Sequence, residues 1–198
     1  MMENQLAREA KLFAVDFEST GHAPGYTDEP WQIGIVPVVA GEVDFTNAYV
    51  RYLRVPPDRP FSPFAPGSWR LVRDELATAP ALHDLWPELR DTFSGYPLIA
   101  HNASTEKKFF RKAWPLHKVG PWIDTLKLSR RAFPELTSYE LSLVIDSAGL
   151  REKLEAALPG REAHDALYDA AACALLVTHW LRHPSWRDLT VGKLMRVK

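Results

Sequence analysis

Residues 12–18, LFAVDFE, combine an apolar β-strand pattern with two acidic side chains. Side chains alternate between the two faces of a strand, so Asp16 and Glu18 share one face while Phe17 points to the other. Like charges on one face of a buried strand repel each other, and burial increases the cost. A bound divalent cation would remove this repulsion, because magnesium and manganese prefer oxygen ligands. The alternative interpretation is that the strand ends at Val15 and both acids are solvated.

The other apolar segments predict a mixed α/β fold. Strand patterns at 31–39 and 43–55 are separated by a tight turn at Gly41, which predicts a β-hairpin. Two shorter strand patterns then alternate with helical patterns. Three successive strands followed by strand–helix units imply a mixed sheet with helices on its faces. The short strands are expected at 96–102 and 121–126, and the helices at 80–94, after Asn102, from a capping box at 137–140 through Ile145, and at 165–181.

Composition and charge narrow the class of protein. The chain has 198 residues, 46% of them hydrophobic, which suits one domain over 1–198 with a core at about 12–183, a short polar N-terminal tail and a C-terminal extension. The net charge of −1 means that a nucleic-acid partner would need a local basic patch. The single cysteine, Cys173, excludes a disulfide within the chain, and no apolar run reaches the length of a membrane span. We therefore expect a cytoplasmic protein that makes no membrane contact.

Two later segments place acids and a histidine at element boundaries. In LIAHNASTE, Asn102 is expected to act as a helix N-cap and Glu106 falls in the first turns of that helix. Taken alone, an acid there is explained by the helix dipole. In HDALYD, His164 and Asp169 can reach one site if the histidine precedes the helix and the aspartate lies within it. The alternative is a histidine at a helix start and an acid on the surface.

Together, DFESTG, HNASTE and HDALYD resemble the motifs of the DEDD superfamily of 3′-to-5′ exonucleases, also called DnaQ-like, in its histidine-bearing subgroup (DEDDh). The resemblance runs from about Leu12 to Leu181 and includes WQIGIV, IAHNA, IDTL and SYELSLV. It implies an RNase H-like mixed five-stranded sheet flanked by helices. It also implies an enzyme that hydrolyses terminal phosphodiester bonds and releases nucleoside 5′-monophosphates.

The resemblance assigns catalytic roles residue by residue. Asp16, Glu18 and Asp169 match the acids that bind two divalent cations, Mg²⁺ or Mn²⁺, and His164 matches the general base. Glu106 also falls at a metal-binding position, where the family usually has an aspartate. The longer side chain keeps the carboxylate and puts the geometry of one metal in question.

The resemblance also implies a set of residues that contact the terminal nucleotide. Thr105 occupies a position where the family usually has an aromatic or bulky apolar residue. Asp124 recurs in the family pattern, but we interpret it as a helix N-cap with no role in the chemistry. The residues expected to bind substrate are Ser19, Thr20, Gly21, His101 and Asn102.

The expected partner is the 3′ end of single-stranded DNA or RNA. Basic residues after the second motif are candidates for phosphate contacts, although charge runs on helices are usually solvated faces. Two alternatives stay open: a catalytically impaired nucleic-acid-binding or assembly module, and a phosphodiesterase for very short oligonucleotides. The resemblance is compatible with a free-standing enzyme, a homodimer or a polymerase partner. The candidate phosphate contacts are Lys107, Lys108, Arg111, Lys112, Arg130 and Arg131.

Overall fold

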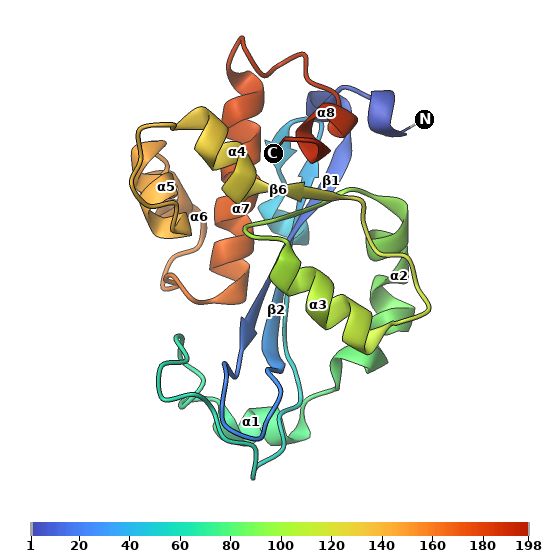
Figure 1. The fold of residues 1–198 in the computed structure, drawn as a ribbon, viewed down its shortest axis with the longest axis vertical. Coiled ribbons are helices and arrows are strands. Elements are labelled where there is room, and N and C mark those ends of the chain that lie inside the picture. The colour runs from blue at the N-terminus through green and yellow to red at the C-terminus, as the bar shows by residue number, and fades with distance from the viewer. Residues whose placement is uncertain (1, 198) are drawn as a thin grey trace.

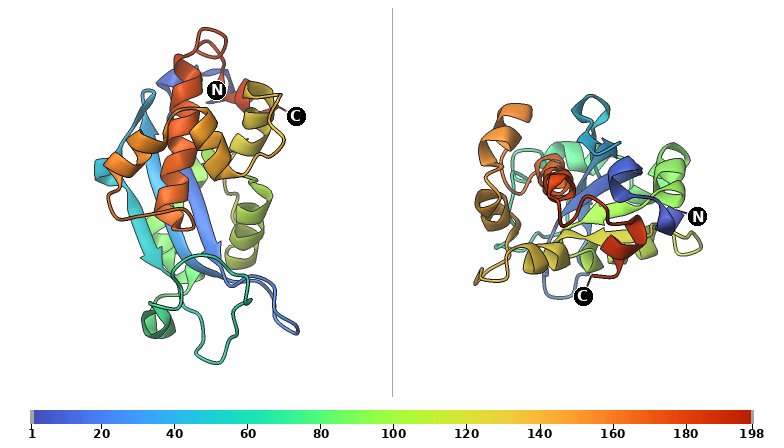
Figure 2. Two further views of the ribbon diagram at one scale, coloured as in Figure 1. Left: turned by 90° about the vertical axis from the view of Figure 1, so that its left-hand side faces the viewer. Right: turned by 90° about the horizontal axis from the view of Figure 1, so that it is seen from above.

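The computed structural model describes residues 2–197, which form a six-stranded mixed sheet with helices on both faces (Figures 1 and 2). The strand order is β3-β2-β1-β5-β6, and β4 also pairs with β2. The β1–β2 pair is antiparallel, whereas β1, β5 and β6 run parallel. The predicted α/β architecture is therefore confirmed. The strands are β1 (Lys11–Ser19), β2 (Pro30–Val39), β3 (Glu42–Val43), β4 (Tyr49–Tyr52), β5 (Leu98–Ala100) and β6 (Trp122–Asp124).

The predicted strand at 43–55 is interrupted, which explains why the sheet has six strands where five were expected. A 3₁₀ turn at Phe45–Asn47 separates β3 from β4, and both strands pair with β2. The Asp44 carboxylate holds this turn by accepting a hydrogen bond from the backbone N–H of Asn47 at 3.2 Å. The hairpin prediction is right in its pairing and wrong in its continuity.

The alternation of β1 divides its side chains between two cores. Leu12 and Ala14 pack with α7, and Phe13, Val15 and Phe17 pack on the opposite face. Figure 1 shows α7 on one side of the sheet and α2 and α3 beside the other. The acids of β1 consequently lie on the α7 face. The helices are α1 (Arg73–Thr78), α2 (Trp86–Gly95), α3 (Ser104–Ala113), α4 (Thr125–Ala132), α5 (Leu141–Ser147), α6 (Arg151–Ala157), α7 (Ala166–Arg182) and α8 (Val191–Met195).

Several predicted helix starts move by a few residues. The pattern at 80–94 divides into a 3₁₀ turn and α2, which begins at Trp86 with Pro87 in its first turn, as the proline requires. The capping box at 137–140 does not form: α5 begins at Leu141 without a side-chain cap. The Ser138 hydroxyl instead accepts the backbone N–H of Glu140, a local bond that competes with the cap.

The start of α3 differs in the same way. Asn102 is not its N-cap, because the helix begins at Ser104 after Ala103. Asn102 has a left-handed backbone, with φ at 62°, and its side-chain oxygen accepts the Ser104 hydroxyl at 2.8 Å. The N-cap prediction for Asp124 is confirmed, since its carboxylate caps α4 through the N–H of Leu126 at 3.0 Å.

Two segments extend beyond the end of the sheet that carries the acids. The connection between β1 and β2 and the long proline-rich connection between β4 and α1 lie together there (Figure 2). Thr20 joins them through its backbone carbonyl, which accepts the N–H of Ser62 at 2.8 Å. Cys173 is buried in α7, and no helix of the described chain could cross a membrane.

Candidate active site

The two acids of β1 line a pocket of about 370 Å³ at the end of the strand. β1 continues to Ser19, and Glu18 is 5% exposed, so the interpretation of two solvated acids beyond a strand end is wrong. Segments far apart in the sequence supply the other walls. The acids that line the pocket are Asp16, Glu18, Glu106 and Asp169, and its two histidines are His101 and His164.

His164 and Asp169 reach one pocket in the arrangement predicted from the sequence, with the histidine before the helix and the aspartate within it. His164 precedes α7, and Asp169 lies in its first turn. The backbone of His164 is left-handed, with φ at 68°, and its N–H donates to the Asp169 carboxylate at 3.1 Å. One side-chain ligand atom each from Glu18, His164 and Asp169 lies within 4.8 Å of the others. These three residues form the tightest cluster of metal-ligating groups in the described chain.

The segment WQIGIV positions the start of α7. A Cβ on Gly34 would lie 2.2 Å from the carbonyl oxygen of Ala166, so only glycine allows this approach. The Gln32 side chain accepts the N–H of Ala166 at 3.0 Å and donates to Asp165 at 3.1 Å. Asp165 in turn caps the helix through the N–H groups of the next turn. These contacts hold His164 and Asp169 against the end of β1.

Glu106 reaches the same pocket from α3. It lies in the first turn of α3, where the helix dipole favours an acid, but it is only 3% exposed, so the dipole alone does not account for its burial. Its Oε2 atom is buried and has no hydrogen-bond partner among the described residues. An orphaned buried carboxylate oxygen carries an energetic penalty that a cation would relieve.

The electrostatics of the pocket also suit a cation. Burial, with smaller contributions from Asp169 and Asp165, raises the pKa of Glu18 to about 8. Burial and the neighbouring acids raise the pKa of Asp16 well above its usual range. Burial likewise raises the pKa values of Glu106 and Asp169. The acid set therefore has hard oxygen donors and unrelieved repulsion, which fits divalent cations such as magnesium or manganese.

Of the five residues expected to bind substrate, three line the pocket and two do not. Ser19, Gly21 and His101 line the pocket. Thr20 is fully buried, and its hydroxyl accepts the N–H of Glu29 at 3.1 Å. Asn102 is exposed and lies outside the lining residues.

The His101 side chain lines the pocket, and both of its ring nitrogens have hydrogen-bond partners within the protein. Nε2 lies 2.8 Å from the carbonyl oxygen of Tyr139, and Nδ1 lies 3.0 Å from the hydroxyl of Thr125. The carbonyl can only accept, so Nε2 carries a proton. Burial lowers the pKa of His101, which favours the neutral ring. The imidazole thus ties β5 to the start of α4 and to the segment before α5.

The proline-rich loop supplies a wall that the sequence interpretation did not identify. Arg59 is 5% exposed and donates to the Thr20 hydroxyl at 3.0 Å and to the carbonyl of Thr27. A Cβ on Gly67, where φ is 79°, would lie 2.6 Å from the carbonyl oxygen of His164. Phe64 is 91% exposed at the pocket rim. The unusual length of this loop was the available signal, because such loops are often functional.

Comparison with known proteins was consistent with this geometry. A family model for exonucleases of the RNase T type matches residues 13–177. Exodeoxyribonuclease 10 of Escherichia coli K12 is 30% identical over 175 residues, covering 88% of this chain and 70% of that protein. DNA polymerase III PolC-type of Bacillus cereus is 28% identical over 184 residues, covering 90% of this chain and 12% of the polymerase.

Solved structures give the same picture of the fold. Exonuclease X in complex with 5′-overhanging duplex DNA superposes with a TM-score of 0.68 and 27% identity, covering 93% of this chain and 99% of that one. The nuclease domain of 3′hExo, a DEDDh family member bound to rAMP, superposes with a TM-score of 0.66 over 89% of this chain and 94% of that one. At 19% identity, the second likeness concerns the fold alone.

Proposed function

The chain belongs to the exonuclease family whose model matches residues 13–177, and from this premise we propose that it is a metal-dependent 3′-to-5′ exonuclease that releases nucleoside 5′-monophosphates. The supporting observation is the convergence of four buried or half-buried acids and one exposed histidine in one pocket. The proposed substrate is single-stranded DNA or RNA, and the names of the relatives favour DNA. The whole chain, 1–198, would act as one exonuclease domain.

The acids would hold two divalent cations, Mg²⁺ or Mn²⁺. When bound, such cations stabilise the charge that develops on the phosphate oxygens and acidify water. Glu18 and Asp169 cluster with His164, and Glu106 reaches the pocket from α3. The proposed metal ligands are Asp16, Glu18, Glu106 and Asp169.

His164 is the proposed general base. Its side chain is exposed to the pocket, where a ring nitrogen can take a proton from the attacking water. The hydrogen bond from its backbone to Asp169 and the close packing of Gly67 against its carbonyl hold the backbone of His164 at the pocket. Histidine suits this role because imidazole titrates near neutral pH.

The pocket rim offers a place for the terminal nucleotide. Ser19 supplies a hydroxyl, and Gly21, with φ at 69°, lets the backbone come close to a bound nucleotide. The exposed ring of Phe64 is available for stacking on a base. Thr20 would contribute indirectly, by holding the rim through Arg59.

The test is a hydrolysis assay with the purified chain and labelled single-stranded DNA, single-stranded RNA or a dinucleotide. We expect mononucleotide release from 3′ ends with magnesium or manganese, and none with a chelator. A covalently closed single-stranded circle should be spared, and rapid cutting of the circle would contradict the proposal. Activity confined to the dinucleotide would identify a phosphodiesterase for short oligonucleotides. Binding without hydrolysis would identify an impaired module.

A further inference from the structure

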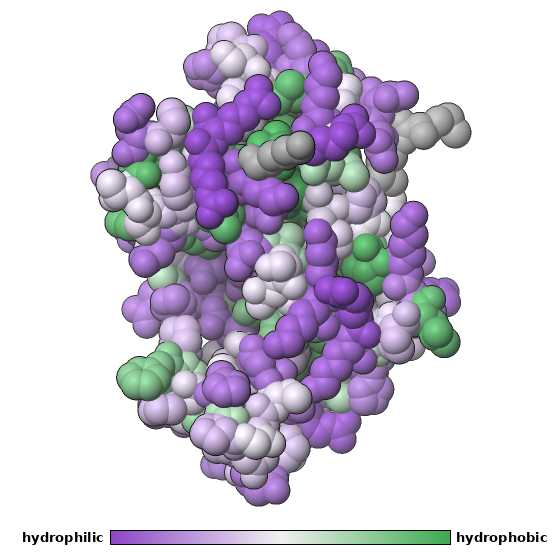
Figure 3. Space-filling view, in the orientation of Figure 1, coloured by the Kyte–Doolittle hydropathy of each residue, from purple (hydrophilic) through white to green (hydrophobic). Residues whose placement is uncertain are grey.

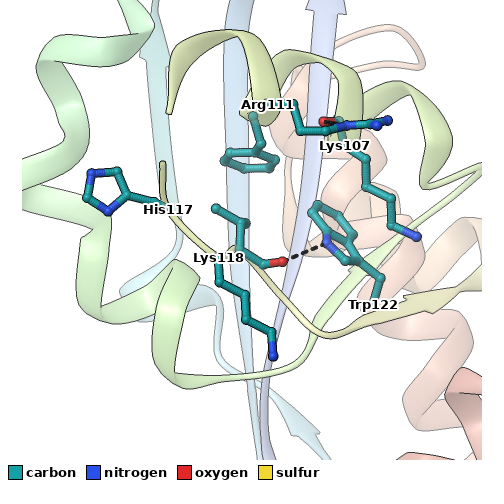
Figure 4. Close-up of a pocket in the computed structure, with 7 residues that line it drawn as sticks. Lys107, Arg111, His117, Lys118 and Trp122 are labelled. Carbon is teal, nitrogen blue, oxygen red and sulfur yellow. Dashed lines mark hydrogen bonds between the residues drawn. The ribbon is translucent and has the colours of Figure 1, made fainter. Parts of the chain in front are cut away.

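A second pocket, of about 290 Å³, lies between α3 and the segment that leads into β6 (Figure 4). Lys107 and Arg111 line it from α3, and His117, Lys118 and Trp122 come from the following segment. Phe110 and Val119 complete its lining, so no acidic side chain contributes to it. The pocket concentrates positive charge on a chain whose net charge is −1.

The structure separates the cations of α3 into two groups. The Lys112 ammonium lies 3.2 Å from the Glu29 carboxylate, in an ion pair outside this pocket. Lys107 and Arg111 lie one helical turn apart, and neither makes an ion pair with an acid of residues 2–197. Lys118 also lacks such a partner within that range. The Arg111 Nε–H donates to the backbone carbonyl of Lys107 at 3.2 Å, and the Lys107 ammonium lies 5.7 Å from the centroid of the Trp122 ring. The two ammonium groups and the terminal nitrogens of Arg111 are left for an anionic ligand.

Aromatic packing fixes the walls of this pocket. The Trp122 indole N–H donates to the carbonyl of Val119 at 3.2 Å, as Figure 4 shows. A Cβ on Gly120, where φ is 95°, would lie 2.5 Å from the Trp122 ring, so glycine is required for this contact. The His117 ring stacks on Trp86 with 3.9 Å between their centroids. The pocket is therefore formed before any ligand binds, which limits the entropy lost on binding.

The position of the pocket indicates a nucleic-acid ligand. Lys107 directly follows Glu106, so α3 carries an acid of the candidate active site and cations of this pocket on neighbouring faces. Hydrophilic side chains cover the outer surface of α3 between the candidate active site and the second pocket (Figure 3). A strand whose 3′ end occupies the active site would find phosphate partners on crossing this helix. Attraction of this kind is independent of sequence and suits an exonuclease.

We propose that Lys107, Arg111 and Lys118 form a phosphate-binding pocket for the nucleic-acid strand, beyond the terminal nucleotide that is hydrolysed. This inference rests on the proposed function for the identity of the strand. The pocket would retain a long substrate between successive cleavages while the active site handles the terminal nucleotide.

The test compares Arg111→Gln/Lys118→Gln with the control Lys153→Gln/Arg187→Gln, which removes the same charges from exposed positions outside the pocket. Fluorescence anisotropy in chelator measures binding of a long single-stranded oligonucleotide, so that no hydrolysis is needed. Two lost phosphate contacts should weaken binding roughly tenfold and reduce the slope of log affinity against log salt by about 1.4. The control should keep the wild-type slope, and affinity for a dinucleotide should not change.

Each remaining outcome decides the question. If Arg111→Gln/Lys118→Gln has the same salt slope as the control variant, the pocket does not bind phosphate, whatever the hydrolysis assay shows. If an acidic peptide of matched charge competes equally well, the pocket binds polyanions in general, and the assignment of a nucleic-acid ligand is wrong. Because Lys118 is exposed, Lys118→Glu provides an independent second measurement and should weaken binding further than Lys118→Gln. Absence of hydrolysis by the wild type would contradict the proposed function and leave the binding result interpretable.

Discussion

At the scale of single residues, the candidate site places charged groups where the folded chain alone disfavours them. Glu18 is nearly inaccessible, and its neighbours in the pocket are further acids. Buried like charges are destabilising unless a counter-ion is present. The buried acids therefore lower the stability of the metal-free protein, and bound divalent cations would reduce this destabilisation.

Glu18→Gln should stabilise the metal-free protein. Burial raises the pKa of Glu18 from 4.5 to about 8, so the folded state holds a proton that the unfolded state releases between these values. Stability in chelator should consequently fall as pH rises through this window, by about 3 kcal/mol at pH 7 from this group. Urea unfolding at several pH values should show a shallower fall for Glu18→Gln. The same pH slope in both proteins would exclude Glu18 as the source.

His164→Ala should lower the rate of mononucleotide release by about 10²- to 10⁴-fold, the usual contribution of a general base. The side chain is exposed, and the acids stay in place, so folding and metal binding should survive. Rates and metal-induced thermal shifts would be compared with His183→Ala, an exposed histidine just beyond the other end of α7. A near-wild-type rate at neutral pH would remove His164 from the base role.

Glu106→Gln should lower activity sharply, and Glu106→Asp less. Gln keeps the shape but removes the charge of a buried carboxylate whose Oε2 atom has no partner among the described residues. Magnesium demands near-ideal geometry, so the wild type should work at least as well with manganese. The measurement is the rate for wild type and both variants in each metal. If Glu106→Gln matches the wild type, Glu106 is not a ligand.

At the scale of elements, the site depends on how closely α7 approaches β2. The segment around Gln32 and Gly34 receives the first turn of the helix, and the side chain of Gln32 satisfies the N–H of Ala166. The proline-rich loop then closes over the other side of His164. The positions of His164 and Asp169 therefore depend on backbone contacts made by residues of β2 and of the proline-rich loop.

Gly34→Ala should reduce activity more than stability. A Cβ there would meet the Ala166 carbonyl at 2.2 Å, so the start of α7 must move away from β2. Overpacking of this kind costs about 1–3 kcal/mol, whereas a displacement of about 1 Å in a catalytic group can cost 10²-fold in rate. Thermal unfolding and kcat would be measured beside Gly95→Ala, where the new Cβ meets no atom within 4 Å. Full activity in Gly34→Ala would show that α7 need not be held so closely.

At the scale of the whole molecule, the two ends of the described chain pack against each other. Ala7 donates its N–H to the carbonyl of Leu189 at 3.0 Å, and Val191 donates to the carbonyl of Gln5 at 3.0 Å. Ala7 and Val191 are fully buried. The segments before β1 and after α7 thus extend the core on the α7 side of the sheet, away from the acids.

Leu194→Ala should destabilise the protein without altering catalysis. Leu194 is 2% exposed in the core that α7 organises, and removing a buried leucine costs about 2–5 kcal/mol. Leu116→Ala is the matched control, because Leu116 is 93% exposed and its loss should be nearly neutral. Denaturant unfolding and kcat well below the melting temperature would be compared. A loss of kcat equal to that of Gly34→Ala would mean that the terminal packing also positions the site.

The sequence by itself predicted the order of the main strands and helices, although not α1, α6 and α8, and it supplied the acid set. Alternation along one strand places Asp16 and Glu18 on one face whatever surrounds them. The resemblance to the exonuclease motifs implied that Glu106, His164 and Asp169 join them, and all five residues line one pocket. The sequence interpretation misplaced the capping box at 137–140 and the continuous strand at 43–55, because local side-chain bonds competed with the regular pattern.

Only the tertiary structure decided which candidates face the pocket and which are occupied elsewhere. Thr20 is held by Arg59, 39 residues away in sequence, and both nitrogens of His101 are engaged by the segments around α4 and α5. Lys112 is paired with Glu29, 83 residues away, whereas Lys107 and Arg111 share a pocket. The physical reason is that strand periodicity follows from neighbouring residues, whereas the partner of a polar side chain depends on which distant segment the fold brings within hydrogen-bonding distance.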